Sequence, residues 1–367
     1  MVLSPPILAA LGSALLFGAS VPLAKSLAGA LSPFLLAGFL YLGSGLGLLV
    51  ARTVRDRGFV RPDMVAGGWA WLALSVLVGG VAGPVLLMVG LAHASATAAS
   101  LLLNIETAFT ALFAWALFGE HVGRRNVGGL ALILAGGLVL ALPSGCAVDP
   151  PGATGTAGVL GACACWALDN NIARKVAGTD ALFLSCVRGL VAGAVNLGIA
   201  LLLGAEMPVA RVAAAAAVIG VAGYGASLAL FLVALRGLGA ARTGAYFAAA
   251  PFVGALVSVA WLREPTSLPF WIATALFLAG VRLYLTERHE HEHEHEPMEH
   301  SHAHRHDEHH RHEHDFEWDG REPHTHVHRH QALVHSHPHF PDLHHRHGHG
   351  AGTTACAGSE AGAPAHE

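Results

Sequence analysis

Long apolar runs, separated by brief polar stretches, dominate residues 1–286. Many of these runs reach the ~20 residues that an α-helix needs to cross a hydrocarbon core ~30 Å thick. A soluble helical protein would need more charged positions to coat its surface than the 15 Lys and Arg and the 9 Asp and Glu found in this part. The sequence therefore predicts an all-α polytopic membrane protein.

Ten transmembrane helices are predicted from the positions of the apolar runs. Their ranges are 6–28, 33–53, 66–92, 95–118, 125–142, 155–174, 181–203, 209–235, 239–262 and 267–286. An excess of Lys and Arg in short loops marks the cytoplasmic side of a membrane. With a cytoplasmic amino terminus, that side carries Arg52, Arg55, Arg57, Arg61, Arg124, Arg125, Arg174, Lys175, Arg236 and Arg242, against Lys25, Arg211 and Arg263 outside. We therefore expect a multi-pass protein of the cell (inner) membrane with both termini in the cytoplasm.

An internal repeat appears when the two halves of the apolar part are overlaid with an offset of 144 to 149 residues. "GLAHASATAASLLLNIETAFTALFAWALFGE", ending at Glu120, runs parallel to "ALRGLGAARTGAYFAAAPFVGALVSVAWLRE", ending at Glu264. Because each half holds an odd number of helices, five, the second half must enter the membrane upside down. This pattern predicts two inverted five-helix repeats, residues 1–143 and 152–286, with a site between them near the membrane midplane.

The repeated halves, their small-residue-rich fourth helices ending in "FGE" and "LRE", and the following "GGLALILAGG" and "TALFLAGV" segments resemble the drug/metabolite transporter superfamily of the EamA type. The resemblance covers residues 7–286. It implies transport of small organic metabolites, often coupled to an ion gradient, and it names no substrate. It implies no enzyme chemistry.

A carboxyl group lies at the centre of the fourth predicted span, in "LLLNIETAFT". Asn104, Thr107 and Thr110 accompany Glu106 on neighbouring faces of the same helix. An ionisable group at such depth is costly and by default functional, and a carboxyl can alternate between protonated and ionised forms during transport. A permanently protonated Glu106 that hydrogen-bonds a neighbouring helix is the structural alternative.

The second half lacks this polar sector, because Ala248, Ala250 and Pro251 occupy the aligned positions. Members of the resembled family often carry proline where Thr107 stands. Both differences predict that the region around Glu106 is specialised in this chain.

A second polar cluster lies in "LDNNIARK" at the cytoplasmic third of the sixth predicted span. Asp169, Asn170 and Asn171 are its members, and Arg188 in the next span could reach Asp169. An unpaired buried charge costs several kcal/mol, so this pair is expected either as a structural or gating ion pair or as a direct substrate contact.

The remaining residues, 287–367, form a different kind of segment, with 24 of the 26 histidines and a formal charge of −10 against +6 in residues 1–286. They lack sustained apolar periodicity, and we expect a disordered cytoplasmic tail rich in His and Glu. Neutral imidazole binds Zn²⁺, Ni²⁺, Co²⁺ and Cu²⁺, whereas the alternative is a solvated, pH-responsive polyampholyte. The candidate ligands are His289, His291, His293, His295, His300, His302, His304, His306, His309, His310, His312, His314, His335, His337, His339, His344, His345, His347 and His349.

Three functions remain open from the sequence. The preferred one is a secondary transporter, expected to be an exporter, of a small organic metabolite or drug, proton-coupled through Glu106 and carrying a metal-binding regulatory tail. The alternatives are a transition-metal exporter fed by the tail and a membrane-tethered metal buffer. We expect no required cofactor; the expected partners are the lipid bilayer, a small-molecule substrate and metal ions, with no nucleic acid, and a homodimer is left open.

Overall fold

A computed structural model describes residues 4–58, 64, 67–118, 124–141, 152–176, 179–285, 290–295, 298–304, 324–330 and 333–338. The chain divides into two compact units, Met1–Glu287 and Arg288–Glu367, which are treated separately below. The first unit holds the predicted membrane part and the second holds the histidine-rich tail.

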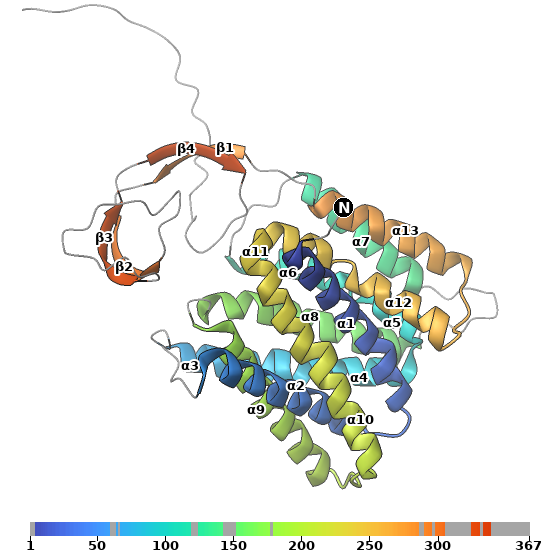
Figure 1. Ribbon diagram of the computed structural model, residues 1–367. Coiled ribbons are helices and arrows are strands. Elements are labelled where there is room, and N and C mark those ends of the chain that lie inside the picture. The colour runs from blue at the N-terminus through green and yellow to red at the C-terminus, as the bar shows by residue number, and fades with distance from the viewer. Residues whose placement is uncertain are drawn as a thin grey trace, which may run out of the picture. The chain divides into compact units, whose positions relative to one another are not determined.

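The described residues of the first unit are all-helical where they form regular structure (Figure 1). The α-helices are α1 (Pro5–Leu27), α2 (Pro33–Asp56), α3 (Gly68–Ser75), α4 (Gly83–His93), α5 (Ala96–Leu102), α6 (Ile105–Phe118), α7 (Arg124–Ala141), α8 (Ala153–Ala173), α9 (Ala181–Leu202), α10 (Ala210–Gly220), α11 (Ser227–Phe247), α12 (Ala250–Trp261) and α13 (Leu268–Leu285). A 3-10 turn, η2 (Arg174–Val176), follows α8. Local signals set several starts: α2 begins with Pro33 after Ser32, whose hydroxyl accepts a hydrogen bond from the Leu35 N–H.

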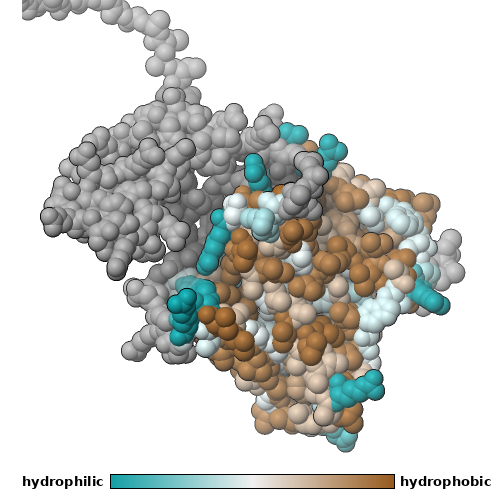
Figure 2. All heavy atoms as spheres, in the orientation of Figure 1, coloured by the Kyte–Doolittle hydropathy of each residue, from teal (hydrophilic) through white to brown (hydrophobic). Residues whose placement is uncertain are grey.

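Seven helical stretches among the described residues are long and apolar enough to cross a membrane. They are Pro5–Leu27, Pro33–Asp56, Gly68–His93, Ala96–Ala116, Ala181–Leu202, Ala210–Gly239 and Arg242–Trp261, beside the shorter apolar helices Arg125–Ala141 and Leu268–Leu283. Large apolar side chains such as Val54, Leu138 and Leu256 lie exposed on the helices. Figure 2 shows apolar residues over most of the visible helical surface, with hydrophilic residues near its margins. Such a surface suits contact with lipid rather than water.

Helices from the first half of the sequence pack mainly against helices from the second half. The largest contacts join α2 to α9, α7 to α13, α1 to α11 and α4 to α8, and Figure 1 shows α7 and α13 side by side. At the α2–α9 crossing the backbones come close at Gly45 and Gly189, where a Cβ on Gly189 would lie 2.7 Å from the Gly45 Cα. Glycine at these positions lets the two backbones touch.

Two of the long helical stretches contain a π-helical turn, and two have a short interruption. The π segments are η1 (Val76–Ala82), between α3 and α4, and η3 (Val221–Ala226), between α10 and α11. The interruptions are residues 103–104, between α5 and α6, and residues 248–249, between α11 and α12. A π turn and a broken helix both leave backbone groups without their usual intrahelical partners, and in membrane proteins such groups commonly line cavities.

Two charged side chains hold the turn between α4 and α5. The Lys25 ammonium donates to the carbonyl oxygens of Leu91 and Ala94, the latter at 2.8 Å. The Glu264 carboxylate accepts from the N–H groups of Ala96 and Thr97 at 2.8 and 2.7 Å. A cation at a helix carboxyl end and an anion at a helix amino end both match the helix dipole, so these residues cap α4 and α5.

The second unit contains four short strands among its described residues. They are β1 (Glu290–His295), β2 (Met298–His304), β3 (His324–His330) and β4 (Leu333–Pro338). β1 pairs antiparallel with β4, and β2 pairs antiparallel with β3. This arrangement differs from the predicted disordered tail at these residues: the alternation of His with other residues has the period of a strand, and pairing satisfies the backbone groups. His289, the histidines from His306 to His314 and those from His339 to His349 lie outside the described residues.

Candidate functional site: a cavity around Glu106

A cavity of about 320 Å³ lies between helices from both halves of the sequence. Six aromatic side chains contribute to its wall. They are Phe17 of α1, Tyr41 of α2, Trp166 of α8, Tyr224 of η3, and Phe231 and Phe247 of α11. Glu106, Asn170 and Arg188 provide the charged and amide groups of the lining.

Five of the six rings form a connected series along the cavity. The centroids of Tyr41 and Tyr224 are 5.7 Å apart, and those of Tyr224 and Phe17 are 5.8 Å apart. Phe17 then contacts Phe247 at 5.4 Å, and Phe247 contacts Phe231 at 5.1 Å. Tilted and edge-on pairs at these separations are the favoured aromatic geometries, so the wall is a packed surface rather than a set of loose side chains.

Glu106 lies one residue inside α6, directly after the interruption that separates it from α5. Its Oε1 accepts a hydrogen bond of 2.9 Å from Nδ2 of Asn170 on α8. The predicted polar clusters of the fourth and sixth spans therefore meet through this bond. Asn170 is exposed to the cavity, so Glu106 is held by a neutral partner that leaves room for a further ligand.

Asp169 and Arg188 form an ion pair behind the cavity wall. The Asp169 side chain is 2% exposed, whereas the Arg188 side chain is 26% exposed and contributes to the lining. The Ser75 hydroxyl also donates to Asp169, over 2.5 Å. Since Asp169 is enclosed and the guanidinium covers it, the predicted pair is present, and only Arg188 of the two lines the cavity.

One backbone oxygen, that of Gly79 in the π segment η1, collects three donors from three different helices. The Tyr41 hydroxyl donates to it over 3.1 Å, the Trp166 indole N–H over 3.0 Å and the Arg188 guanidinium over 3.2 Å. A Cβ at position 79 would lie 2.3 Å from an Asp169 carboxylate oxygen. Because glycine has no side chain, the backbone at position 79 can lie close to the Asp169–Arg188 ion pair.

A second cavity, of about 270 Å³, adjoins the first and shares Phe17, Glu106 and Phe247 with it. Asn104 and Thr107 line this second cavity, as predicted members of the polar sector around Glu106. The Asn104 side chain also donates to the Leu101 carbonyl oxygen over 2.8 Å, across the interruption. Glu106 therefore lines both cavities.

Besides the enclosed Asp169, two further predicted site residues lie away from both linings. Asn171 is buried and donates to the carbonyl oxygens of Ala167 and Thr110, at 2.9 and 3.3 Å. The Thr110 hydroxyl is buried as well and has no hydrogen-bond partner among the described residues. Both residues join α6 to α8 and support the site from behind.

The aromatic wall is the part of the site that the sequence did not reveal. One signal pointed to it: the overlay of the two halves matches the aromatic start of "FGASVPLAK" at Phe17 with that of "WALDNNIARK" at Trp166. Both residues line the cavity. The repeated aromatic residue in the two halves could therefore have indicated, from the sequence alone, two residues of the cavity wall.

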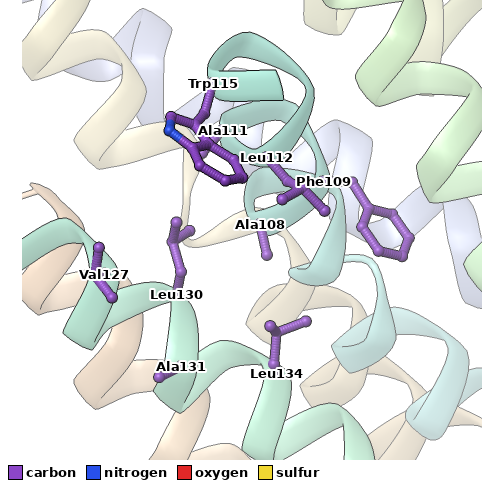
Figure 3. A pocket seen from close by; sticks show the side chains of 9 residues that line it. All are labelled: Ala108, Phe109, Ala111, Leu112, Trp115, Val127, Leu130, Ala131 and Leu134. Carbon is purple, nitrogen blue, oxygen red and sulfur yellow. The ribbon is translucent and has the colours of Figure 1, made fainter. Parts of the chain in front are cut away.

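A third cavity, of about 440 Å³, has a different character (Figure 3). Side chains of α6, among them Trp115 and Leu112, and of α7, among them Val127 and Leu134, surround it. The indole nitrogen of Trp115 is the one polar side-chain atom of the nine lining residues. These four side chains are also exposed on the helical surface, so the space suits an apolar lipid chain better than a polar solute.

Comparison with known proteins identifies the class. A family model described as the EamA-like transporter family matches residues 4–142 and again residues 153–286. The chain belongs to the EamA-like transporter family. It is accordingly a multi-pass membrane protein and a transporter of small solutes, in a family of transporters rather than enzymes.

Proteins that are similar to this chain include a transporter and a protein of known crystal structure. An "Uncharacterized transporter" of Methanothermobacter thermautotrophicus is 29% identical over 280 residues, which are 72% of this chain and 81% of that protein. A protein of known crystal structure is 22% identical, with a TM-score of 0.55 over 76% of this chain and 95% of its own. The latter likeness concerns the fold alone.

Proposed function

We propose that this chain is a secondary transporter that exports a small organic solute through the cavity around Glu106. In this proposal ten transmembrane helices form two inverted five-helix repeats, residues 1–143 and 152–286, with both termini in the cytoplasm. The observation that carries the proposal is an ionisable group beside a helix interruption, on the wall of a cavity that helices from both halves enclose. Secondary transporters place their solute sites in this way.

The helix pairings support the inverted repeat. In the proposed numbering the second span, α2, packs on the seventh, α9, and the fifth, α7, packs on the tenth, α13. The first and eighth spans and the third and sixth spans pair likewise, through α1 with α11 and α4 with α8. A two-fold relation between the halves maps the first-with-eighth pairing onto the sixth-with-third pairing and maps each of the other two onto itself, so all four pairings agree with it. Movement of one half against the other would then expose the cavity alternately.

Glu106 is proposed as the coupling group. Its carboxyl belongs to a membrane-spanning stretch, contacts the neutral Asn170, and faces both cavities. A carboxylate in such a place needs charge compensation, which a proton or a solute can supply. Exchange of one for the other would link solute movement to the proton gradient.

Asp169 and Arg188 are proposed as a positioning pair. Their charges compensate each other, and the Arg188 guanidinium also reaches the Gly79 oxygen in η1. The pair therefore ties α8 and α9 to the π segment. Direct contact with solute is open to Arg188, which lines the cavity, and not to the enclosed Asp169.

The histidine-rich tail is proposed to bind a divalent transition metal, Zn²⁺, Ni²⁺, Co²⁺ or Cu²⁺, and to regulate transport. The support is compositional, because imidazole is a preferred ligand of these ions. Among the described residues no group of three or more His, Cys, Asp or Glu is arranged to hold a metal. In the transition-metal exporter alternative the tail would instead feed metal ions to the transport path.

Filling the cavity tests the proposed transport path. Ser185 of α9 lines the cavity, whereas Val195 of the same helix is 40% exposed on the outer surface. In proteoliposomes assayed with a panel of radiolabelled amines, amino acids, sugars and transition metals, Ser185→Trp should abolish flux and Val195→Trp should leave it near the wild-type rate. Equal flux in the two variants would show that solute takes another path.

A further inference from the structure

We propose that the transported solute is an organic cation, a protonated amine or quaternary ammonium with an apolar or aromatic body. Its charge would lie against Glu106 and its body against the ring series of the cavity. This inference rests on the proposed transport function and names the substrate class of the same site.

The charge balance of the cavity is the first support. The lining and the layer directly behind it contain Glu106, Asp169 and Arg188. Asp169 already compensates Arg188, and the partner of Glu106 is the neutral amide of Asn170. With Glu106 ionised, the site holds one uncompensated negative charge. A cationic solute restores neutrality, whereas an anionic one would double the imbalance.

The distribution of hydrogen-bond donors is the second support. The Tyr41 hydroxyl, the Trp166 indole N–H and one Arg188 nitrogen all point to the Gly79 carbonyl oxygen. These donors therefore already have a hydrogen-bond partner within the protein, and Tyr41 and Trp166 present their apolar rings to the cavity. A carboxylate or phosphate needs several convergent donors, and this cavity has few left to offer. An ammonium group needs acceptors, which Glu106 supplies.

The aromatic series is the third support. Phe17 contacts both Tyr224 and Phe247, and all three rings lie on the wall that also contains Glu106. Aromatic faces attract ammonium ions, more strongly when the site is shielded from water. The volume of about 320 Å³ is near the lower end of ligand pockets, roughly 300–1,000 Å³, so a compact cation fits better than a long one.

A zwitterion such as an amino acid is the nearest competitor, since Arg188 is partly exposed to the cavity. Its carboxylate would have to share the guanidinium with Asp169 and with the Gly79 oxygen. The existing bonds would be weakened, and the net charge of the site would stay at minus one. The geometry therefore favours a solute with a cation alone.

Four probes that share a phenylethyl body separate these cases. 2-Phenylethylamine is a cation at pH 7, phenylalanine a zwitterion, 2-phenylethanol neutral and 3-phenylpropionate an anion. Binding to the purified full-length chain in detergent is measured by isothermal titration. We expect the amine to bind, with each of the other three at least roughly tenfold weaker. The alcohol and the anion lack an ammonium group for the Glu106 carboxylate and the rings, and phenylalanine brings a carboxylate that the site does not balance.

Two variant pairs locate the binding. Glu106→Gln should weaken amine binding roughly tenfold, to the level of the neutral probe, whereas Glu206→Gln, in the exposed turn before α10, should not change it. Phe247→Leu should weaken amine binding several-fold, whereas Phe113→Leu, on α6 and outside the lining, should not. Circular dichroism and gel filtration establish that each variant is folded.

Two results would overturn the substrate class. One is binding of phenylalanine or 3-phenylpropionate as tight as that of the amine, a comparison that needs no variant. The other is undiminished amine binding in folded Glu106→Gln protein. Proteoliposomes could at the same time transport an amino acid, sugar or metal, with flux that Ser185→Trp abolishes. The proposed transport path would then be retained, and only the proposal of a cationic substrate would be rejected.

Discussion

Two interrupted helices of this transporter share one geometry and differ in chemistry. In the first half, α5 stops at Leu102 and α6 begins at Ile105; in the second half, α11 stops at Phe247 and α12 begins at Ala250. Asn104 lies in the first interruption and Glu106 just after it, whereas Ala248 lies in the second and Pro251 just after it. All four residues line the same cavity of about 270 Å³. Both halves thus have an interrupted helix, but only the first half has polar side chains at the interruption.

This difference suggests separate roles for the two features: the interruptions permit helix movement, and the polar side chains bind the solute or proton. An interruption without polar side chains still frees backbone groups and permits a bend, which both halves would need for alternating access. A carboxyl in both halves would place two like charges across one small cavity, which is unfavourable in a region of low dielectric constant. A single Glu106 gives the cavity one charge that a single proton or cation can balance.

Loss of the carboxyl is the change with the largest expected effect on transport. Glu106→Gln keeps the size and the Asn170 contact of the side chain but removes its charge, so proton-coupled flux should fall roughly a hundredfold or more. The measurement is proton movement, followed with a pH-sensitive dye inside proteoliposomes, on addition of the transported solute. Glu206→Gln, in the exposed turn before α10, serves as the control and should retain coupling. Full coupling in Glu106→Gln would assign the proton to another group.

A smaller effect, on stability rather than on coupling, is expected at the ion pair. Asp169→Asn leaves Arg188 without its charge partner inside the protein, and because the guanidinium is partly exposed to the cavity, the loss should be about 2–4 kcal/mol. Thermal unfolding in detergent measures it. Addition of Arg188→Met to Asp169→Asn should recover much of the stability. A double variant no more stable than Asp169→Asn alone would argue that Arg188 acts through Gly79 and not through the pair.

The smallest expected effect on transport concerns the tail. A chain truncated after Arg288 keeps both interrupted helices, so solute flux without metal should stay within about twofold of the full-length rate. Zn²⁺ and Ni²⁺ binding, measured by titration, should disappear with the 19 candidate histidines. Metal flux that depends on the tail would contradict this expectation and support the metal exporter. It would then assign the tail a direct part in transport.

The positions of the apolar helices followed closely from the sequence. The predicted span 6–28 corresponds to α1, Pro5–Leu27, and 181–203 to α9, Ala181–Leu202. Hydropathy does not register how a helix is wound, however, so the π turns within 66–92 and 209–235 were not predicted. The helix break at Gly239, where φ is +77°, a backbone angle that glycine adopts readily, lies at the predicted boundary between the spans 209–235 and 239–262.

The charged part of the candidate site was also accessible from the sequence, because Glu106, Asp169 and Arg188 are conspicuous in apolar surroundings. The contact between Asn170 and Glu106 joins residues 64 positions apart and needed the three-dimensional fold. Aromatic residues such as Phe231 and Phe247 have no such contrast with their neighbours, since other aromatic side chains of this chain, such as Trp115 and Trp271, lie exposed on the helical surface. Their role appears only once the cavity is known.

The Gly79 oxygen also determines how this region tolerates change over evolutionary time. A hydrogen-bond acceptor supplied by the backbone cannot be deleted by any substitution, so the connection between α2, α8 and α9 is protected from loss by point mutation of the acceptor. Its donors, in contrast, can each be replaced singly while the other two remain. Substitution of Gly79 itself is restricted by sterics, because any side chain at position 79 would clash with Asp169. In a mutational scan, the most restricted residue here would thus be one with no side chain at all.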